Sequence, residues 1–299
     1  MIVTRRPRPF AGLTLERPRL MGIVNVTPDS FSDGGEAYAL DSALARAAAL
    51  LDDGADIVDV GGESTRPGAA PVTAKEEVRR VLPVIRQLAG QGVLVSVDTR
   101  KAVVMEAALE AGARIVNDVT GLAGDRRSLD VVAGSDAALV LMHMRGDPSS
   151  MQVDPHYDDP AAEVADWLRG RIRACRDAGI DAARIAVDPG IGFGKTVDHN
   201  LDLLARLGVI ADLGHPVVVG VSRKSFISRI DRNEPATNRL GGSLAAGLAA
   251  VAQGGDILRV HDVAATRQAL AVWQAIQRAD PDVDANGTEV TAVESADLI

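Results

Sequence analysis

The stretch MGIVNVTPDSFSDGG, residues 21–35, joins a buried strand to a loop of polar residues and glycine. Residues 21–26 are apolar except for Asn25, which predicts a strand that is buried on both faces. Pro28 ends this strand because proline has no amide hydrogen for the ladder, and the paired Gly34 and Gly35 can act as a hinge. The loop 27–35 is therefore either a lid over a site or an ordinary surface turn.

The same alternation of a short apolar strand and a helix repeats along the chain. Strands are expected at 21–26, 56–60, 93–97, 114–116, 137–142, 184–187, 216–221 and 256–260. Helices are expected at 41–52, 73–89, 101–111, 128–133, 160–178, 198–207, 238–252 and 262–278, the second opened by a capping box of Thr73 and Glu76. Eight such units without a linker predict a single-domain α/β fold, a (β/α)8 TIM barrel. A doubly wound open sheet is the alternative.

The two ends of the chain differ from this central domain, which spans residues 19–279. Residues 1–18 are rich in Pro and Arg and are expected to form a loose arm or a short hairpin that closes one end of the fold. Residues 280–299 contain six acidic residues and no Lys or Arg, and they show no periodicity. This composition predicts a disordered acidic tail.

The composition excludes several classes of protein. A net charge of −9 argues against a broad basic surface for nucleic acid. The longest apolar stretch, residues 240–252, is interrupted by glycines and is too short for a membrane span. Cys175 is the single cysteine, so no disulfide framework can form, and we expect a cytoplasmic protein.

Polar side chains collect in or just after the predicted strands. They are Asn25, Glu63, Ser64, Thr65, Arg66, Asp98, Asn117, His143, Asp188, Ser222, Arg223, Lys224, Arg259 and His261. Each alone has a structural explanation, since a strand-end aspartate often caps the next helix. In a barrel, however, these strand ends converge on the face that carries active sites.

These residues suggest two subsites. Asp98, Asn117 and Asp188 offer carboxylate and amide groups that suit a planar nitrogenous ring with an amidine-like edge. A second, cationic set suits a phosphorylated substrate and consists of Arg66, Arg223, Lys224, Arg259 and His261. The guanidinium group of Arg259 can also lie flat on a ring.

The stretch DPGIGFGK, residues 188–195, is rich in glycine but lacks the spacing of a Walker phosphate loop. Its glycines allow the backbone to pass close to a flat ligand, with Phe193 as an aromatic wall. The alternative is a plain glycine-rich connection with Phe193 in the core.

Several motifs together resemble those of the dihydropteroate synthases of the folate pathway. The similarity extends from Met21 to about Arg278. It rests on MGIVNVTPDSFSDGG (21–35), DVGGESTRPGA (59–69), VDT (97–99), NDVTG (117–121), LMH (141–143), DPGIGFGK (188–195), SRKSF (222–226) and RVHD (259–262). The resemblance implies a (β/α)8 barrel, a homodimer, and the joining of 4-aminobenzoate to (7,8-dihydropterin-6-yl)methyl diphosphate with release of pyrophosphate.

The resemblance also implies roles for individual residues. Pterin would be bound by Asp98, Asn117, Met142, Asp188, Phe193, Lys224 and Arg259, with Arg259 stacked on the ring. Asn25 would ligate Mg²⁺ on the diphosphate, whose oxygens would contact Arg66, Arg259 and His261. The aminobenzoate pocket would consist of Phe31, Thr65, Pro67 and Ser225. Asp98, Lys224, Arg259 and His261 would be the catalytic set.

Two other functions share these features. A pterin-binding methyltransferase barrel would keep Asp98, Asn117 and Asp188 but would not need the SRK and RVHD residues or the SFSDGG loop. A catalytically silent paralogue would bind pterin without turnover, although both loops are complete here. We expect small-molecule substrates as partners, with no nucleic acid and no membrane.

Overall fold

The computed structural model describes residues 9–26, 35–64, 71–147 and 150–279. Eight parallel strands form one sheet in the order β6-β5-β4-β3-β2-β1-β8-β7. They are β1 (Arg19–Asn25), β2 (Ile57–Gly61), β3 (Val95–Asp98), β4 (Ile115–Asp118), β5 (Ala138–Met142), β6 (Ile185–Asp188), β7 (Val218–Val219) and β8 (Ile257–Val260). The predicted single-domain (β/α)8 barrel is confirmed, and the doubly wound alternative is wrong.

The barrel closes between β6 and β7, where the pairing is weakest. A single bridge joins Val187 to Val217, outside the two residues of β7. The predicted strand 216–221 is shorter than expected because Pro216 has no amide hydrogen, while the amide of Val217 donates to the Asp256 carboxylate (2.8 Å). After Val219 the chain turns toward the mouth of the barrel.

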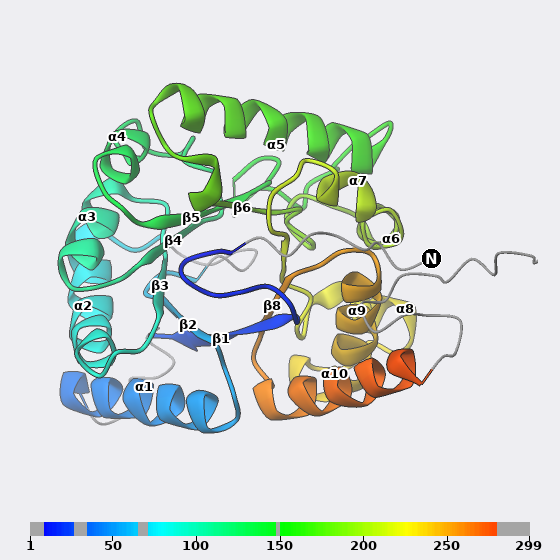
Figure 1. The fold of residues 1–299 in the computed structure, drawn as a ribbon, viewed down its shortest axis with the longest axis horizontal. Coiled ribbons are helices and arrows are strands. Elements are labelled where there is room, and N and C mark those ends of the chain that lie inside the picture. The colour runs from blue at the N-terminus through cyan, green and yellow to red at the C-terminus, as the bar shows by residue number, and fades with distance from the viewer. Residues whose placement is uncertain (1–8, 27–34, 65–70, 148–149, 280–299) are drawn as a thin grey trace, which may run out of the picture.

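The helices surround the barrel, as Figure 1 shows. They are α1 (Gly35–Asp52), α2 (Ala74–Gly90), α3 (Ala102–Glu110), α4 (Ser128–Ala133), α5 (Pro160–Asp177), α6 (Val197–Ala205), α7 (Gly208–Ala211), α8 (Ser225–Ile230), α9 (Leu240–Ala252) and α10 (Val263–Arg278), with 3-10 turns at Ala182–Arg184 and Ala236–Asn238. The sequence did not predict α7 and α8, because neither is long enough to establish a helical period.

The start of α2 differs from its prediction. The Thr73 hydroxyl accepts a hydrogen bond from the amide of Glu76 (3.3 Å), which is half of a capping box. The Glu76 carboxylate binds Arg79 and Arg80 instead of returning to the Thr73 amide. The expected box is therefore only an N-cap, since two guanidinium groups compete for the carboxylate.

A tight turn at the N-terminus closes one end of the barrel. Phe10 and Leu13 exchange two backbone hydrogen bonds of 2.9 Å, and the Phe10 side chain is fully buried. It packs with Met21, Ile57 and Ile115, residues near the beginnings of their strands. Figure 1 shows this segment, in dark blue, lying across the barrel. Of the two forms expected for the arm, residues 10–13 adopt the closing turn.

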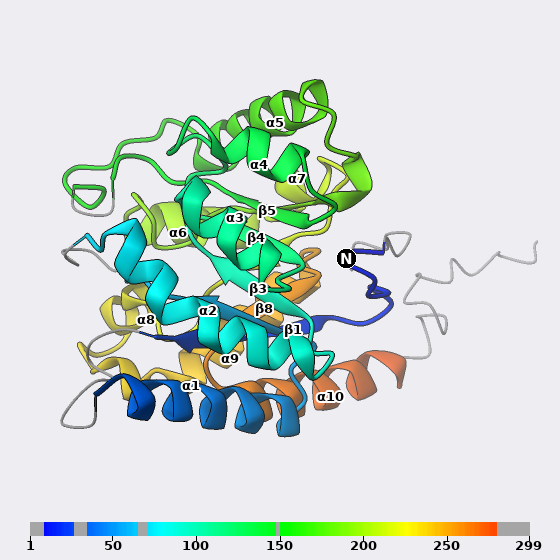
Figure 2. The ribbon, with the colours of Figure 1, turned by 90° about the vertical axis from the view of Figure 1, so that its left-hand side faces the viewer.

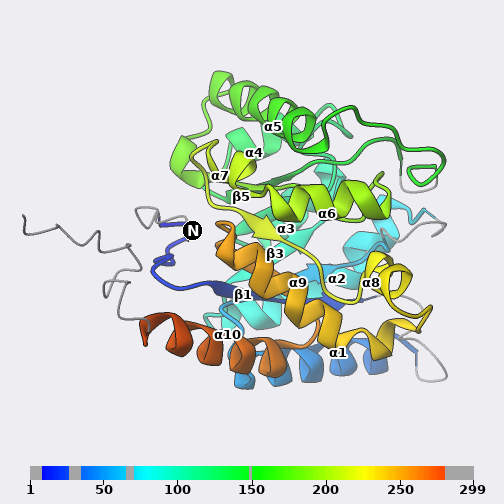
Figure 3. The same cartoon turned by 90° about the vertical axis from the view of Figure 1, so that its right-hand side faces the viewer.

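The opposite end of the barrel carries the long loops. Figures 2 and 3 show that α8 and the loop between β5 and α5 project from the side away from the N-terminal segment. This is the end at which the parallel strands finish, so it is the place to look for an active site.

Candidate active site

The two-residue period of the strands sorts the barrel interior into an apolar floor and a polar mouth. Ile57, Ile115 and Ile257 belong to the floor, and two residues later the same strands place Asp59, Asn117 and Arg259. In each case the polar side chain therefore lies one layer nearer the C-terminal end than the apolar one. Sequence alternation alone is enough to build this change of layer.

Arg259 lies between two carboxylates at the centre of the mouth. Its Nε donates to Asp59 Oδ2 at 2.7 Å, and its Nη2 donates to Asp98 Oδ2 at 2.6 Å. Asp59 is fully buried, and Asp98 is 8% exposed. The two ion pairs hold the guanidinium group in a fixed orientation, because each nitrogen has its own acceptor.

Asn117 shares an acceptor with Arg259. Its Nδ2 donates to Asp59 Oδ2 at 3.2 Å, while Asp59 Oδ1 is buried without a hydrogen-bond partner among the described residues. Asp59 was not among the predicted site residues, because it lies inside a strand and not at its end. A charged residue within an otherwise apolar buried strand was the signal that could have identified it.

Asp188 and Lys224 form the second half of the mouth. Asp188 Oδ1 accepts a hydrogen bond from the Gly190 amide at 2.7 Å, and within the described chain Oδ2 has no donor. Lys224 Nζ donates to the carbonyl of Ile191 and lies 4.5 Å from the centre of the Phe193 ring. Phe193 is half-buried beside this cation, so its position fits an aromatic wall better than a core residue.

Burial and neighbouring charges shift the acid–base properties of these groups. The pKa of Asp98 is raised to about 7. Burial is the main cause, the charge of Arg259 opposes it, and the nearby Asp59 carboxylate adds to it. Burial also raises the pKa of Asp188 and lowers that of Lys224 to about 8. For Arg259, burial alone would lower the pKa, but the carboxylates of Asp59 and Asp98 reverse the direction and raise it.

The polar residues after β7 and β8 form two separate pairs. His261 Nδ1 lies 3.0 Å from the Ser222 hydroxyl, which also accepts a hydrogen bond from the His261 amide (3.1 Å). Arg223 Nε donates to Asp262 Oδ2 at 2.9 Å. The predicted contribution of Arg223 to the cationic subsite is therefore weakened, because Asp262 neutralises its charge.

The remaining predicted residues fall into two groups. Asn25 is exposed at the end of β1, where its Oδ1 and Asp98 Oδ2 would lie 3.7 and 3.6 Å from a Cβ built on Gly61. Met142 is buried at the end of β5 in register with Asp188, and Ser225 is exposed at the start of α8. Phe31, Thr65, Arg66 and Pro67 lie outside the described residues.

His143 is one of the polar residues that follow the predicted strands, and its side chain contacts Lys195. It is 3% exposed, and its Nδ1 lies 3.0 Å from Nζ of the buried Lys195. Glu63 forms another separate network: its carboxylate accepts from the Val72 amide (2.9 Å) and from Arg100 and Lys101 (3.1 and 3.0 Å). Glu63 thus connects residues on both sides of segment 65–70.

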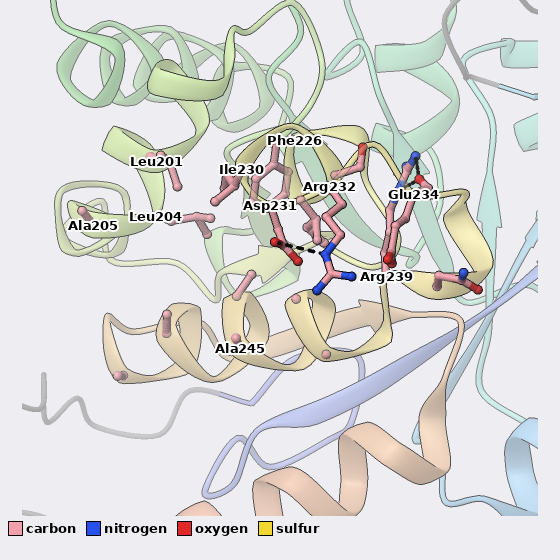
Figure 4. A pocket seen from close by; sticks show the side chains of 18 of the residues that line it. Leu201, Leu204, Ala205, Phe226, Ile230, Asp231, Arg232, Glu234, Arg239 and Ala245 are labelled. Atoms are coloured by element: carbon pink, nitrogen blue, oxygen red, sulfur yellow. Dashed lines mark hydrogen bonds and ion pairs between the residues drawn. The ribbon is translucent and has the colours of Figure 1, made fainter.

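A second cavity lies outside the barrel, between α6, α8 and α9 (Figure 4). Its volume is about 800 Å³, and its lining is mainly apolar, including Leu201, Phe226, Ile230 and Ala245. Asp231, Arg232, Glu234 and Arg239 add both signs of charge to it. In the part of the chain that the structure describes, no helix has the length and apolar character needed to cross a membrane.

Comparisons with known proteins identify the family of the chain. Residues 21–261 match the family described as pterin binding enzyme. The chain is 49% identical over 266 residues to the dihydropteroate synthase of Neisseria meningitidis serogroup C, covering 88% of this chain and 94% of that protein. The chain belongs to the pterin binding enzyme family, which confirms the resemblance drawn from its motifs.

Solved structures give the more particular assignment within the family. The dihydropteroate synthase of Xanthomonas albilineans with 4-aminobenzoic acid is 52% identical, with a TM-score of 0.84 and coverage of 90% of this chain and 97% of that one. The enzyme from the same organism in complex with 7,8-dihydropteroate is 49% identical, with a TM-score of 0.81 and coverage of 89% and 96%. These similar proteins are all dihydropteroate synthases.

Proposed function

We infer that this chain is a transferase of the dihydropteroate synthase type. It condenses (7,8-dihydropterin-6-yl)methyl diphosphate with 4-aminobenzoate to give 7,8-dihydropteroate and pyrophosphate. The observation that carries this conclusion is the convergence of Asp98, Asn117 and Asp188 with Lys224 and Arg259 at the barrel mouth. Identities near 50% over most of the chain to dihydropteroate synthases support the same reaction.

The pterin ring binds between the two halves of the mouth. Asp188 presents a carboxylate oxygen to the amidine-like edge of the ring, and Asn117 and Asp98 face the same space from neighbouring strands. Met142 and Phe193 supply apolar contact, and Arg259 provides a planar cation for stacking. Because the ion pairs with Asp59 and Asp98 already orient Arg259, little side-chain ordering remains for binding.

The reaction is a dissociative displacement. The bond between the pterin methylene and the diphosphate breaks, the positive charge spreads into the ring, and the aminobenzoate nitrogen attacks the methylene and then loses a proton. The carboxylates of Asp59, Asp98 and Asp188 stabilise the positive charge on the ring. Arg66, Arg259 and His261 stabilise the departing pyrophosphate, and Lys224 with Phe193 keeps the ring in place.

The mouth fits Mg²⁺ that arrives with the diphosphate. Among the described residues no group of three or more His, Cys, Asp and Glu side chains could hold a metal ion. Mg²⁺ usually keeps several waters and uses one or two protein oxygens together with substrate phosphates, so the exposed Asn25 is a suitable single ligand. When bound, the ion would neutralise charge on the leaving group.

We infer that the second substrate binds beside the pterin site. We assign the aminobenzoate pocket to Phe31, Thr65, Pro67 and Ser225, of which Ser225 at the start of α8 lies next to Lys224. This placement would bring the aminobenzoate amine close to the pterin methylene. We propose that pterin binds first and aminobenzoate second, because Asp98 and Asp188 are buried whereas Ser225 is exposed.

The deciding experiment measures pyrophosphate release and dihydropteroate formation by the purified full chain with both substrates and Mg²⁺. We expect turnover that depends on both substrates and is abolished by EDTA. Pterin binding without pyrophosphate release would instead identify a silent paralogue. Transfer of a methyl group from a methylated folate would identify the methyltransferase alternative.

We propose that the chain forms a homodimer through the cavity between α6, α8 and α9. Leu201 and Ile230 line it and are 42% and 55% exposed, which is unusual for large apolar side chains. The mixed charges of Asp231, Arg232, Glu234 and Arg239 allow a two-fold related copy to pair with the same surface. Light scattering should give a dimer mass, and Ile230→Asp should give a monomer; a monomeric wild type would contradict the proposal.

We also propose a cytoplasmic location. Cys175, the single cysteine, is a free and buried thiol, and burial raises its pKa to about 11. A thiol of this kind is unreactive and suits a reducing compartment. Fractionation of the native cells would test the location.

A further inference from the structure

The backbone carbonyls of the glycine-rich loop after β6 are bound by side chains, from Lys195 at the end of the loop and from three residues elsewhere in the chain. Five consecutive carbonyls, those of residues 190–194, each accept a hydrogen bond from a side chain. The donors are Lys195 for Gly190 and Phe193 (3.0 Å each), Lys224 for Ile191, Gln152 for Gly192 (2.7 Å) and Tyr157 for Gly194 (2.9 Å). The loop also contains one turn, in which the Phe193 amide donates to the Gly190 carbonyl (3.0 Å), and the Asp188 and Asn200 side chains accept from the amides of Gly190 and Gly192 (2.7 and 2.6 Å). The side-chain donors to its carbonyls and these contacts together determine the path of the loop.

Lys195 makes two of these five contacts from a buried position. The residue is 2% exposed, and its Nζ also lies 3.0 Å from His143 Nδ1. Two N–H groups suffice for the two carbonyls, and both the charged and the neutral amino group carry at least two. The contact with the loop is therefore independent of the charge on Lys195, whose pKa is lowered by burial.

His143 is the third hydrogen-bond partner of the Lys195 amino group. Its Nδ1 accepts from a charged Lys195 or donates to a neutral one, and in both arrangements the imidazole is neutral. The other groups near this pair are Lys224, Asp188 and Arg145, with Tyr157 and Trp167 as aromatic neighbours. Burial lowers the pKa of His143 to about 2, and the positive charges of Lys195 and Arg145 act in the same direction.

The loop also packs without free space against the segment after β5. A Cβ on Gly190 would lie 1.9 Å from the His143 carbonyl oxygen, and a Cβ on Gly194 would lie 2.4 Å from that of Arg145. Both glycines have positive φ, +66° and +61°. The backbone amide of His143 meanwhile donates to the Asp188 carbonyl at 3.0 Å. The segment that begins at His143 and the loop that begins at Asp188 are therefore joined by backbone as well as side-chain contacts.

We propose that Lys195, supported by His143, is a positioning residue for pterin binding. It fixes the loop that carries Phe193 at one end of the ring site and begins beside Asp188 at the other. The same loop supplies the Ile191 carbonyl that holds Lys224. Loss of the Lys195 contacts would displace three ring-binding groups together while leaving Ser225 and the aminobenzoate side unaffected. This inference rests on the proposed function.

Three variants of the full-length protein test the role. Lys195→Met keeps the length of the side chain and removes every donor. His143→Leu and His143→Asn are nearly the same size, and only Asn can exchange a hydrogen bond with Lys195 at the position of Nδ1. Lys75→Met, on the exposed start of α2, is the control for the loss of a lysine. Thermal unfolding identifies the variants that fold.

The readouts are the Kd for the pterin diphosphate by calorimetry and the KM for each substrate. We expect Lys195→Met and His143→Leu to raise the pterin Kd and KM at least tenfold, with the KM for aminobenzoate changing less than twofold. His143→Asn should remain within threefold of the wild type. Should Lys195→Met not fold, the comparison of His143→Leu with His143→Asn decides.

Three results would overturn the assignment. These are unchanged pterin affinity in Lys195→Met, equal affinities in His143→Leu and His143→Asn, or an equal rise of KM for both substrates, which would indicate general loosening. Failure of the proposed function is recognised separately, because the wild type would then bind pterin diphosphate without turnover or not bind it at all.

Discussion

The floor and the mouth of the barrel are built from the same strands, but the floor buries apolar side chains and the mouth buries charged ones. At the floor, Phe10 closes the barrel with a fully buried ring packed on Met21, Ile57 and Ile115. At the mouth, Asp59, Asp98 and Arg259 place three charges in a space that is nearly as well buried. Burial at the floor stabilises the fold, whereas burial at the mouth costs stability and prepares a binding site. Substitutions at the two ends should therefore separate stability from activity.

The largest effect is expected for Lys224→Ala at the mouth. Loss of the ammonium group removes the hydrogen bond to the Ile191 carbonyl and the cation beside Phe193 and Asp188. We expect kcat/KM to fall roughly a thousandfold, in the range found for loss of one charge-stabilising group, with the thermal midpoint close to that of the wild type. Lys75→Ala is the control. A near-wild-type kcat/KM would remove Lys224 from the site.

Phe10→Ala should show the opposite behaviour. Truncation of this ring leaves a cavity under the barrel, which typically costs about 3–5 kcal/mol of unfolding free energy. Urea titration measures that loss, and kcat/KM at 25 °C should stay within about twofold of the wild type while the protein is folded. Val153→Ala, at a position 78% exposed, is the control. A loss of kcat/KM equal to that of Lys224→Ala would contradict the claim that the floor contributes to stability and the mouth to activity.

Asp188→Asn tests a single contact of the mouth. The amide can still accept from the Gly190 amide but no longer offers a carboxylate to the ring, so pterin affinity should fall about 10–100-fold. Calorimetry gives the Kd, and Asp212→Asn at an exposed position is the comparison. The assignment does not survive if the pterin Kd is unchanged.

His143 gives a pH dependence with a definite sign. Its pKa is about 2 when folded and about 6.5 when unfolded, so between these values only the unfolded chain binds the proton. Its contribution to stability is complete above pH 6.5 and decreases as the pH falls. From pH 8 to 5 this amounts to about 2 kcal/mol. The decrease in unfolding free energy on acidification should be smaller in His143→Asn by that amount; equal decreases would show that His143 is not held neutral.

The smallest expected effect concerns the start of α2, whose cap contacts neither the floor nor the ring-binding residues. Thr73→Ala removes an N-cap and should cost about 1 kcal/mol without any change in kcat/KM. Glu76→Ala should cost less than about 0.5 kcal/mol, because the partly exposed carboxylate pairs with Arg79 and Arg80 and does not cap the helix. Equal costs measured by urea titration would indicate the complete capping box that the sequence predicted.

The barrel and most of the mouth were predictable because both follow from short-range patterns. Every second residue of a strand faces the barrel interior, so an apolar residue followed two positions later by a polar one predicts an apolar floor and a polar mouth. The fold then brings the ends of the eight strands together. For this reason the amino-acid sequence alone was enough to predict that Asp98, Asn117, Asp188 and Arg259 are neighbours.

The pairing of charges was not predictable in the same way. Arg223 and Lys224 are adjacent in the sequence, yet Asp262 neutralises the first, while Asp188 faces the second. His143 follows a predicted strand as the ring-binding residues do, but its side chain contacts Lys195, because the loop after β6 folds back over the end of β5. Such choices depend on backbone paths through irregular segments, on which strand periodicity has no bearing.

The hydrogen bonds to carbonyls 190–194 have a consequence for protein engineering. The segment DPGIGFGK contains its glycines but only Lys195 of the four side chains that bind its carbonyls, and the other three lie at 152, 157 and 224. Grafting these eight residues onto another barrel would transfer the sequence of the loop without most of the side chains that bind its carbonyls. A transplant that reproduces the shape would need the segment after β5 and the start of α8 as well, so the smallest portable unit of this site is three loops.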